Sequence, residues 1–132
     1  MGNNTRSETM RAVKAKDTKP EMQVRRMLFK AGYRYRLHRS DLPGKPDLVF
    51  PSRKKIIFVH GCFWHGHTCR RGNRLPKSNR DYWSSKIKRN VERDRTHLSK
   101  LRHLGWVTHI VWECELRDQD RVFQQLKRFL DS

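Results

Sequence analysis

The chain has 132 residues, a length that fits a single domain, residues 1–132, with one hydrophobic core. Its 31 Lys and Arg against 13 Asp and Glu give a formal net charge of +18. The longest apolar run, Ile56–Val59, is too short for a membrane-spanning helix, and no apolar segment near Met1 indicates a secretory signal. Three cysteines cannot all pair within one chain, so we expect a cytosolic protein without a disulfide framework.

The positive charge is spread along the whole chain. Residues 1–66 carry 15 basic side chains and residues 67–132 carry 16, so the folded body itself is basic. Residues 70–102 alone carry 12 basic and 3 acidic side chains. This balance predicts a polyanionic partner, and nucleic acid is the leading one. The alternative, a protein of membrane surfaces, usually has a long amphipathic basic helix.

Two helices come first in chain order. Ser7 is placed to cap a short basic helix over residues 7–16. Thr18 as N-cap, Pro20 in the first turn and Glu21 as the acidic member of a capping box predict a second helix. Gly32 is expected to end this helix. Its buried face is predicted to hold Val24, Leu28 and Ala31.

Strand patterns follow over residues 33–38, 47–50 and 55–60. The last two are expected to form a hairpin through residues 51–54, and the segment 55–60 is apolar enough to be buried on both faces. Residues 61–80 have no periodicity, which predicts an irregular loop.

The longest predicted helix covers residues 81–104. Its apolar stripe is interrupted by Asp94 and otherwise consists of Ile87, Val91, Leu98 and Leu101. A strand over 106–113 and a final helix that begins at Asp118 complete the chain. This order predicts an α/β fold in which helices flank a small mixed sheet.

Histidine and cysteine are concentrated in the segment from His60 to Cys69. Zn²⁺ favours four thiolate or imidazole ligands, and three Cys with one His are a common structural set. The expected ligands are Cys62, His67, Cys69 and Cys114, which use every cysteine of the chain. The alternative is three unrelated buried thiols with histidines on the surface.

A catalytic site is the second interpretation of this region. Asp47 begins one strand of the predicted hairpin and His60 ends the other, while His65 lies in the loop. A carboxylate there can hold Mg²⁺ against a phosphate, and a neutral histidine can take a proton from water. Equally, an Asp after Pro often only caps a turn, and a His beside zinc often only bonds the backbone.

Adjacent aromatic residues in a polar loop are the third feature. Phe63 and Trp64 cannot both enter the core easily, so one packs under the zinc site or both form a wedge between base pairs. Tyr82 and Trp83 follow one loop later and can join them. The basic residues between these aromatic pairs, which include Arg70 and Arg71, suit phosphate contact.

Four segments together resemble the very-short-patch repair (Vsr) mismatch endonucleases: PGKPDLVF at 43–50, IIFVHGCFWHGHTC at 56–69, YWSSKIKRNVERDR at 82–95 and LGWVTHIVWECEL at 104–116. The resemblance implies a restriction-endonuclease-like α/β/α fold. It also implies a Mg²⁺-dependent endonuclease that nicks duplex DNA 5′ of the thymine in T:G mismatches left by 5-methylcytosine deamination. Two Mg²⁺ ions and one structural Zn²⁺ are the expected cofactors.

The resemblance assigns roles to single residues. Asp47 binds Mg²⁺ with the backbone carbonyl of Val59, where the family commonly has Thr. His65 is the general base or its equivalent, and His60 contacts the scissile phosphate. Cys62, His67, Cys69 and Cys114 hold the zinc. The DNA contacts are an intercalating wedge and a basic grip, formed by Phe63, Trp64, Trp83, Arg70, Arg71 and Lys86.

The resemblance also bears on supporting residues and on partners. Glu21 matches an acidic position of the early helix, and Asp94, if buried, should pair with Arg or Lys or hydrogen-bond a catalytic His. Residues 1–17 are expected to form a DNA-gripping arm and residues 18–132 the catalytic core. We expect a monomer at the bacterial nucleoid that works with mismatch-repair and repair-synthesis proteins. The competing hypotheses are a zinc-stabilised DNA-binding module without catalysis and a nickase for other lesions.

Overall fold

The computed structural model describes residues 18–62, 65, 67 and 79–132. Its centre is a four-stranded sheet in the order β1-β2-β3-β4. The first two strand pairs are antiparallel, whereas β3 and β4 run parallel, so the sheet is mixed as predicted. The strands are β1 (Arg36–Leu37), β2 (Leu48–Phe50), β3 (Lys55–His60) and β4 (Val107–Trp112).

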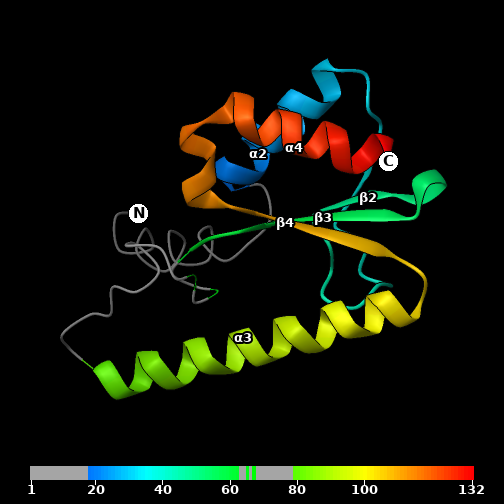
Figure 1. The fold of residues 1–132 in the computed structure, drawn as a ribbon. Helices are drawn as coiled ribbons and strands as arrows, with labels where there is room; N and C mark the ends of the chain where they lie inside the picture. The colour runs from blue at the N-terminus through cyan, green and yellow to red at the C-terminus, as the bar shows by residue number, and fades with distance from the viewer. Residues whose placement is uncertain (1–17, 63–64, 66, 68–78) are drawn as a thin grey trace, which may run out of the picture.

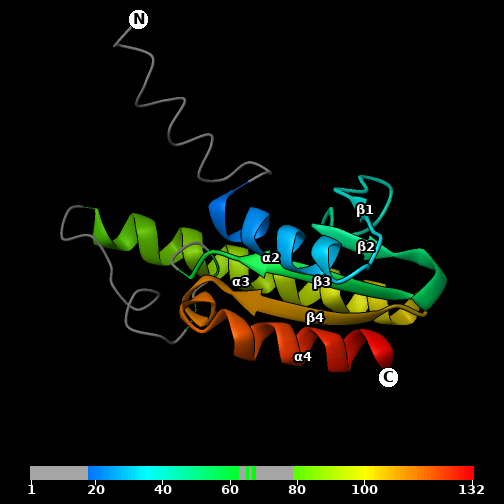
Figure 2. The same cartoon turned by 90° about the horizontal axis from the view of Figure 1, so that it is seen from above.

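Helices cover both faces of this sheet. The helices α2 (Lys19–Lys30) and α4 (Gln119–Asp131) lie on one side, and the long helix α3 (Arg80–His103) lies on the other (Figure 1). Seen from above, α2 and α4 run along the strands with α3 behind them (Figure 2). Two short 3-10 helices, η2 (Pro51–Arg53) and η3 (Glu113–Arg117), connect the elements. The layers are therefore helix, sheet, helix.

Alternating side chains of the central strands fill two separate cores. Leu48 and Ile57 pack with residues of α2 and α4, which include Val24, Leu28 and Leu126. Their neighbours Val49 and Ile56 face α3 and pack with Leu101 and Trp106. Strand β3 contributes to both cores because both of its faces are covered, as its apolar composition predicted.

The parallel pair determines where the functional residues meet. The helix α3 connects β3 to β4, and their register pairs His60 with Trp112 at the carboxyl ends of both strands. The chain then continues from these ends into Cys62 and into η3 with Cys114. Residues 52 positions apart in sequence consequently lie together, since Cys114 N–H contacts Cys62 Sγ at 3.4 Å.

Three local expectations are wrong. The strand predicted over 33–38 has only the residues Arg36–Leu37, and the chain leaves it at His38, whose φ of 48° is left-handed. The capping box predicted for α2 is not formed, because the side chain of Thr18 makes no cap hydrogen bond. Glu21 is instead buried, with 2% of its surface exposed, and contacts residues outside its helix. Ala31, which was predicted on the buried face, is exposed.

The predicted N-terminal helix and arm lie outside the described residues. Within residues 18–62, 65, 67 and 79–132, no helix is both long and apolar enough to cross a bilayer.

Candidate active site

The first part of the site is a pair of carboxyl groups near the end of β3. Asp47 immediately precedes β2, and its Oδ2 accepts a hydrogen bond of 2.7 Å from the backbone N–H of Val59 in β3. Glu21 reaches the same place from α2, and His38 from the end of β1. One potential ligand atom from each of Glu21, His38 and Asp47 lies within 4.8 Å of the other two.

The electrostatics of this group suit a cation. The pKa of Asp47 is raised to about 7, chiefly by burial and also by the charge and hydrogen bond of the neighbouring Glu21, with the Val59 N–H acting in the opposite direction. Two adjacent carboxyl groups resist losing both protons unless a positive charge is near. A divalent cation supplies that charge, and carboxylate oxygens are the ligands that Mg²⁺ and Mn²⁺ prefer. The donor set therefore fits the divalent metal expected from the sequence.

The second part is a pair of stacked histidines beside a carboxylate. The rings of His60 and His65 are parallel within 5°, with centroids 3.7 Å apart. His65 Nδ1 lies 2.6 Å from Asp94 Oδ2 of α3, and the backbone N–H of His65 bonds Gly61. Asp94, which interrupts the apolar stripe of α3, is partly buried. Its contact with His65 is one of the contacts that the sequence led us to expect for a buried Asp94.

His60 is the more buried member of this pair, with 6% of its surface exposed. Burial lowers its pKa to about 3, and the nearby His65 acts in the same direction while Asp94 opposes it. The ring is accordingly neutral at physiological pH. Its Nδ1 is buried and makes no hydrogen bond within the described part of the chain, so the site contains an unsatisfied polar atom.

The third part brings together three of the four predicted zinc ligands. Cys62, His67 and Cys114 place one potential ligand atom each within 4.8 Å of the others. Cys114 Sγ and His67 Nδ1 are 3.6 Å apart, and the backbone N–H of His67 bonds Cys62. The fourth predicted ligand, Cys69, lies outside the described residues. Two thiols and an imidazole at this spacing form a group that can hold a metal such as zinc.

An aromatic ring separates the histidine pair from the cysteine group. Trp112 stacks on His67 with centroids 4.2 Å apart, and the rings of Trp112 and His60 meet edge to face with centroids 5.3 Å apart. Trp112 therefore contacts both the histidine pair and the cysteine group, so the cysteine group can fix the position of the histidines. Trp112 was not singled out by the sequence, although its place two residues before Cys114 was a signal.

The DNA-contact residues predicted from the sequence are described only in part. At the start of α3 the rings of Tyr82 and Trp83 meet edge to face at 5.2 Å. Lys86 Nζ lies over both rings, 5.8 and 5.7 Å from their centroids. Tyr82 is exposed, so these residues form an accessible aromatic and cationic surface. The other predicted contacts, Phe63, Trp64, Arg70 and Arg71, lie outside the described residues.

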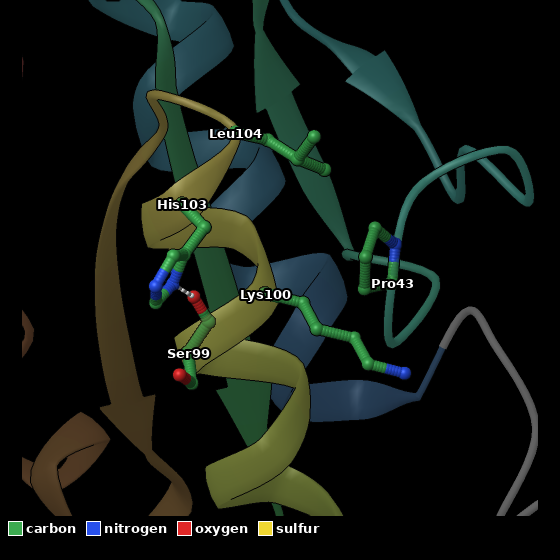
Figure 3. A pocket seen from close by; sticks show the side chains of 5 residues that line it. All are labelled: Pro43, Ser99, Lys100, His103 and Leu104. Carbon is green, nitrogen blue, oxygen red and sulfur yellow. Dashed lines mark hydrogen bonds between the residues drawn. The ribbon is translucent and has the colours of Figure 1, made fainter.

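A pocket elsewhere on the molecule does not contribute to this site. It lies between Pro43 and the last turns of α3, and none of the predicted site residues lines it (Figure 3). The helix residues around it are Ser99, Lys100, His103 and Leu104.

The domain is basic, and paired carboxyl groups and a neutral histidine lie at one end of its sheet. These are the groups that a nuclease uses. Residues 1–71 match the model of a family described as DNA mismatch endonuclease Vsr. The chain is 53% identical over 122 residues to the type II nicking enzyme V.XorIIP of Xanthomonas oryzae pv. oryzae, covering 92% of this chain and 89% of the relative.

Two further relatives agree. The type II nicking enzyme V.NmeAIP of Neisseria meningitidis is 43% identical, over 95% of this chain and 89% of its own length. The DNA mismatch endonuclease Vsr of Escherichia coli is 42% identical, over 89% of this chain and 75% of its own length. The chain belongs to the Vsr family of DNA mismatch endonucleases, as the sequence motifs predicted.

Proposed function

We propose that this protein nicks one strand of duplex DNA 5′ of the thymine in a T:G mismatch, by metal-dependent hydrolysis of a phosphodiester in a restriction-endonuclease-like fold. One observation carries the proposal. Asp47 bonds the backbone of Val59, the residue before His60, so the carboxyl pair and the histidine pair adjoin. A cation site next to a proton acceptor is what hydrolysis of a phosphodiester requires.

The histidine pair provides the proton acceptor. Asp94, as a carboxylate, accepts the Nδ1–H of His65, which leaves His65 Nε2 with a free lone pair. In this tautomer Nε2 takes a proton from the attacking water. The ring of His60 stacks on the ring of His65 and is neutral. Its Nδ1, which has no hydrogen-bond partner within the described residues, is available as a donor to a phosphate oxygen.

The carboxyl pair holds the cation against the phosphate. Asp47 is the principal ligand, Glu21 lies beside it, and the carbonyl of Val59 adds a further oxygen. Mg²⁺ held by these residues, with a second ion expected, would polarise the phosphate and would stabilise the leaving 3′-oxygen.

Zinc is proposed as a structural ion of the Cys62, His67 and Cys114 group, with Cys69 as the fourth ligand. Such an ion ties the loop after β3 to the 3-10 helix after β4. Since a chain of this length has little apolar surface to stabilise an irregular loop, the ion contributes to folding.

DNA binding is assigned to charge and to aromatic insertion. We propose that Trp83, with Phe63 and Trp64, enters the base stack at the mismatch, where unstacking costs less than in a matched duplex. Arg70, Arg71 and Lys86 contact phosphates, and residues 1–17 grip the duplex from outside the core formed by 18–132. With a net charge of +18, the affinity should fall steeply with salt.

A second candidate is a nickase of the same fold that acts on other lesions, and the sequence context of the cleaved site also stays a point to test. Relatives at 53% and 43% identity are named type II nicking enzymes, so the flanking bases required here need not match those of the Escherichia coli protein. We also propose a monomer that acts in the bacterial cytoplasm and hands its nicked product to mismatch-repair and repair-synthesis proteins.

A nicking assay tests the proposal. Duplexes with a T:G mismatch and their T:A and G:C counterparts are incubated with Mg²⁺ or with EDTA, in several flanking contexts. We expect one nick 5′ of the mismatched thymine with Mg²⁺ and none with EDTA. Nicking of other lesions points to the second candidate, and tight binding without any product points to a binding module without catalysis.

The variant Asp47→Ala should lose nicking but retain binding to the mismatch, because it removes the principal ligand and none of the DNA grip. Binding is measured by fluorescence anisotropy with the same duplex. Normal nicking by this variant rules out the assigned active site.

The variant Cys114→Ser should lose zinc and then unfold or aggregate, because the loop after β3 loses its anchor. Metal content by mass spectrometry and far-UV circular dichroism measure the two effects. A stable, zinc-free and active variant would show that the metal assignment is wrong.

A further inference from the structure

His38 occupies a place in the site that the strand register determines. Leu37 of β1 pairs with Leu48 of β2, so the next residues outward, His38 and Asp47, face each other. The backbone N–H of His38 bonds the carbonyl of Asp47 at 3.2 Å. These two residues therefore form the closed base of the loop 39–46, and both are held at the carboxyl group of Glu21.

The conformation of His38 is unusual for its residue type. Its φ of 48° lies in the left-handed region, which costs free energy for a residue with a Cβ. Non-glycine residues remain in this region where the surrounding structure requires it, and such positions gather at functional sites. Here the backbone bond to Asp47 and a contact of 2.7 Å between His38 Nε2 and Glu21 Oε2 hold the residue in place.

The side chain of His38 is also chemically different from its two neighbours. Glu21 and Asp47 offer carboxylate oxygens, the ligands of Mg²⁺, whereas the imidazole offers a nitrogen. Nitrogen ligands favour transition-metal ions over Mg²⁺. Because a ligand atom of His38 lies within 4.8 Å of one from each carboxyl group, a single cation can contact all three side chains.

We propose that His38 is the third protein ligand of the cation at Glu21 and Asp47, and that it gives this nickase a preference for Mn²⁺ over Mg²⁺. The proposal rests on the cation site of the proposed function. On binding, His38 Nε2 exchanges its contact with Glu21 for the metal and carries its proton on Nδ1 instead. The carboxylate of Glu21, which Arg25 also contacts at 3.4 Å, then binds the same ion.

The competing role for His38 is to orient Glu21 by the hydrogen bond seen in the free protein. A Gln at this position can keep a hydrogen bond to Glu21 but cannot supply an imidazole nitrogen. The variant His38→Gln thus separates ligation from orientation. His103→Gln is the matched control, because His103 is an exposed histidine on α3 that contacts only its own helix among the bonds described, through Ser99.

The experiment measures Mn²⁺ binding to the full chain without DNA, by electron paramagnetic resonance. Pulsed measurements on the bound ion detect nitrogen ligands directly. We expect a nitrogen coupling in the unchanged protein and in His103→Gln, and its loss in His38→Gln. We also expect His38→Gln to weaken Mn²⁺ binding by about 10-fold and Mg²⁺ binding by much less. The ratio of nicking rates in Mn²⁺ and Mg²⁺ should fall in the same variant.

The outcomes separate this inference from the proposed function. If Asp47→Ala abolishes Mn²⁺ binding but His38→Gln leaves the affinity and the nitrogen signal unchanged, His38 is not a ligand and the cation site itself stands. If Mn²⁺ binding does not depend on Asp47, both the ligand role of His38 and the proposed cation site are wrong.

Discussion

A polar side chain is buried at each end of β3, and the two side chains differ in their hydrogen bonding. Lys55 at the beginning and His60 at the end are 8% and 6% exposed. Lys55 Nζ donates to the carbonyls of Phe129 and Leu130 at 2.6 and 3.2 Å, and to the carbonyl of Ser132 at 2.8 Å. Phe129 and Leu130 lie in the last turn of α4, whose carbonyl groups have no partner within the helix, and Ser132 follows that turn. Lys55 thereby fastens α4 to the sheet.

His60 has no such set of partners. Its Nδ1 is buried without a hydrogen bond in the part of the chain that the structure describes, although buried polar atoms almost always find one. A protein can leave such an atom open where a ligand completes it. We infer that the Lys55 end of β3 contributes to stability and that the His60 end contributes to binding.

The largest expected effect is at the binding end. The variant His60→Leu keeps a similar volume but removes the open nitrogen, so nicking should fall on the order of 10²–10³-fold, the usual loss for one donor to the reacting group. The free energy of unfolding should change by less than about 1 kcal/mol, because no hydrogen bond of Nδ1 is lost. Single-turnover nicking and urea unfolding measure the two. A large loss of stability with normal nicking would contradict the assignment of His60 to binding.

The opposite result is expected at the other end. Lys55→Met removes a buried charged donor and its bonds to Phe129, Leu130 and Ser132, so stability should fall by about 2 kcal/mol. Nicking below the unfolding temperature should stay normal. Lys127→Met, an exposed lysine of α4, is the control and should change neither quantity. If Lys55→Met is as stable as this control, the anchor contributes nothing and the stable end needs another explanation.

The smallest expected effect is on the pH dependence of stability. His109 in β4 is partly buried against Phe129, whose carbonyl Lys55 binds. Burial lowers the pKa of His109, with the charge of Glu115 opposing. A lowered pKa in the folded state means stability that is present above about pH 6.5 and lost as the pH falls. Between pH 7.5 and 5, the unchanged protein should therefore lose more stability than His109→Gln, by under about 1 kcal/mol. Equal losses contradict this role.

Local patterns predicted most elements well. The helix expected over 81–104 is observed as Arg80–His103, and the strand expected over 55–60 has those bounds. Both contain many residues of one periodicity, so neighbours along the chain determine the outcome. The strand over 33–38 was predicted too long because the alternation of its residues does not reveal where its partner ends. Strand β2 begins only at Leu48, so the paired ladder ends at Leu37, and beyond it His38 makes a single backbone bond to Asp47.

The candidate site shows the same division. Asp47, His60 and the Cys and His residues from 62 to 67 were found from their types and spacing, which local sequence displays. For Glu21 the residue pattern predicts a capping role, because the position after Pro20 fits it, and only the family resemblance adds Glu21 to the supporting residues of the site. Its contact with His38 depends on how α2 packs against the sheet, which no short pattern contains.

The sequence by itself determined a basic, single-family α/β nuclease with its principal candidate residues, because charge, periodicity and motif are properties of the chain. Only the tertiary structure placed Glu21 and His38 beside Asp47, and Asp94 beside His65. It also distinguished the satisfied Lys55 from the open His60. The physical reason is that strand register and the packing of helices against both faces of the sheet decide which distant side chains meet.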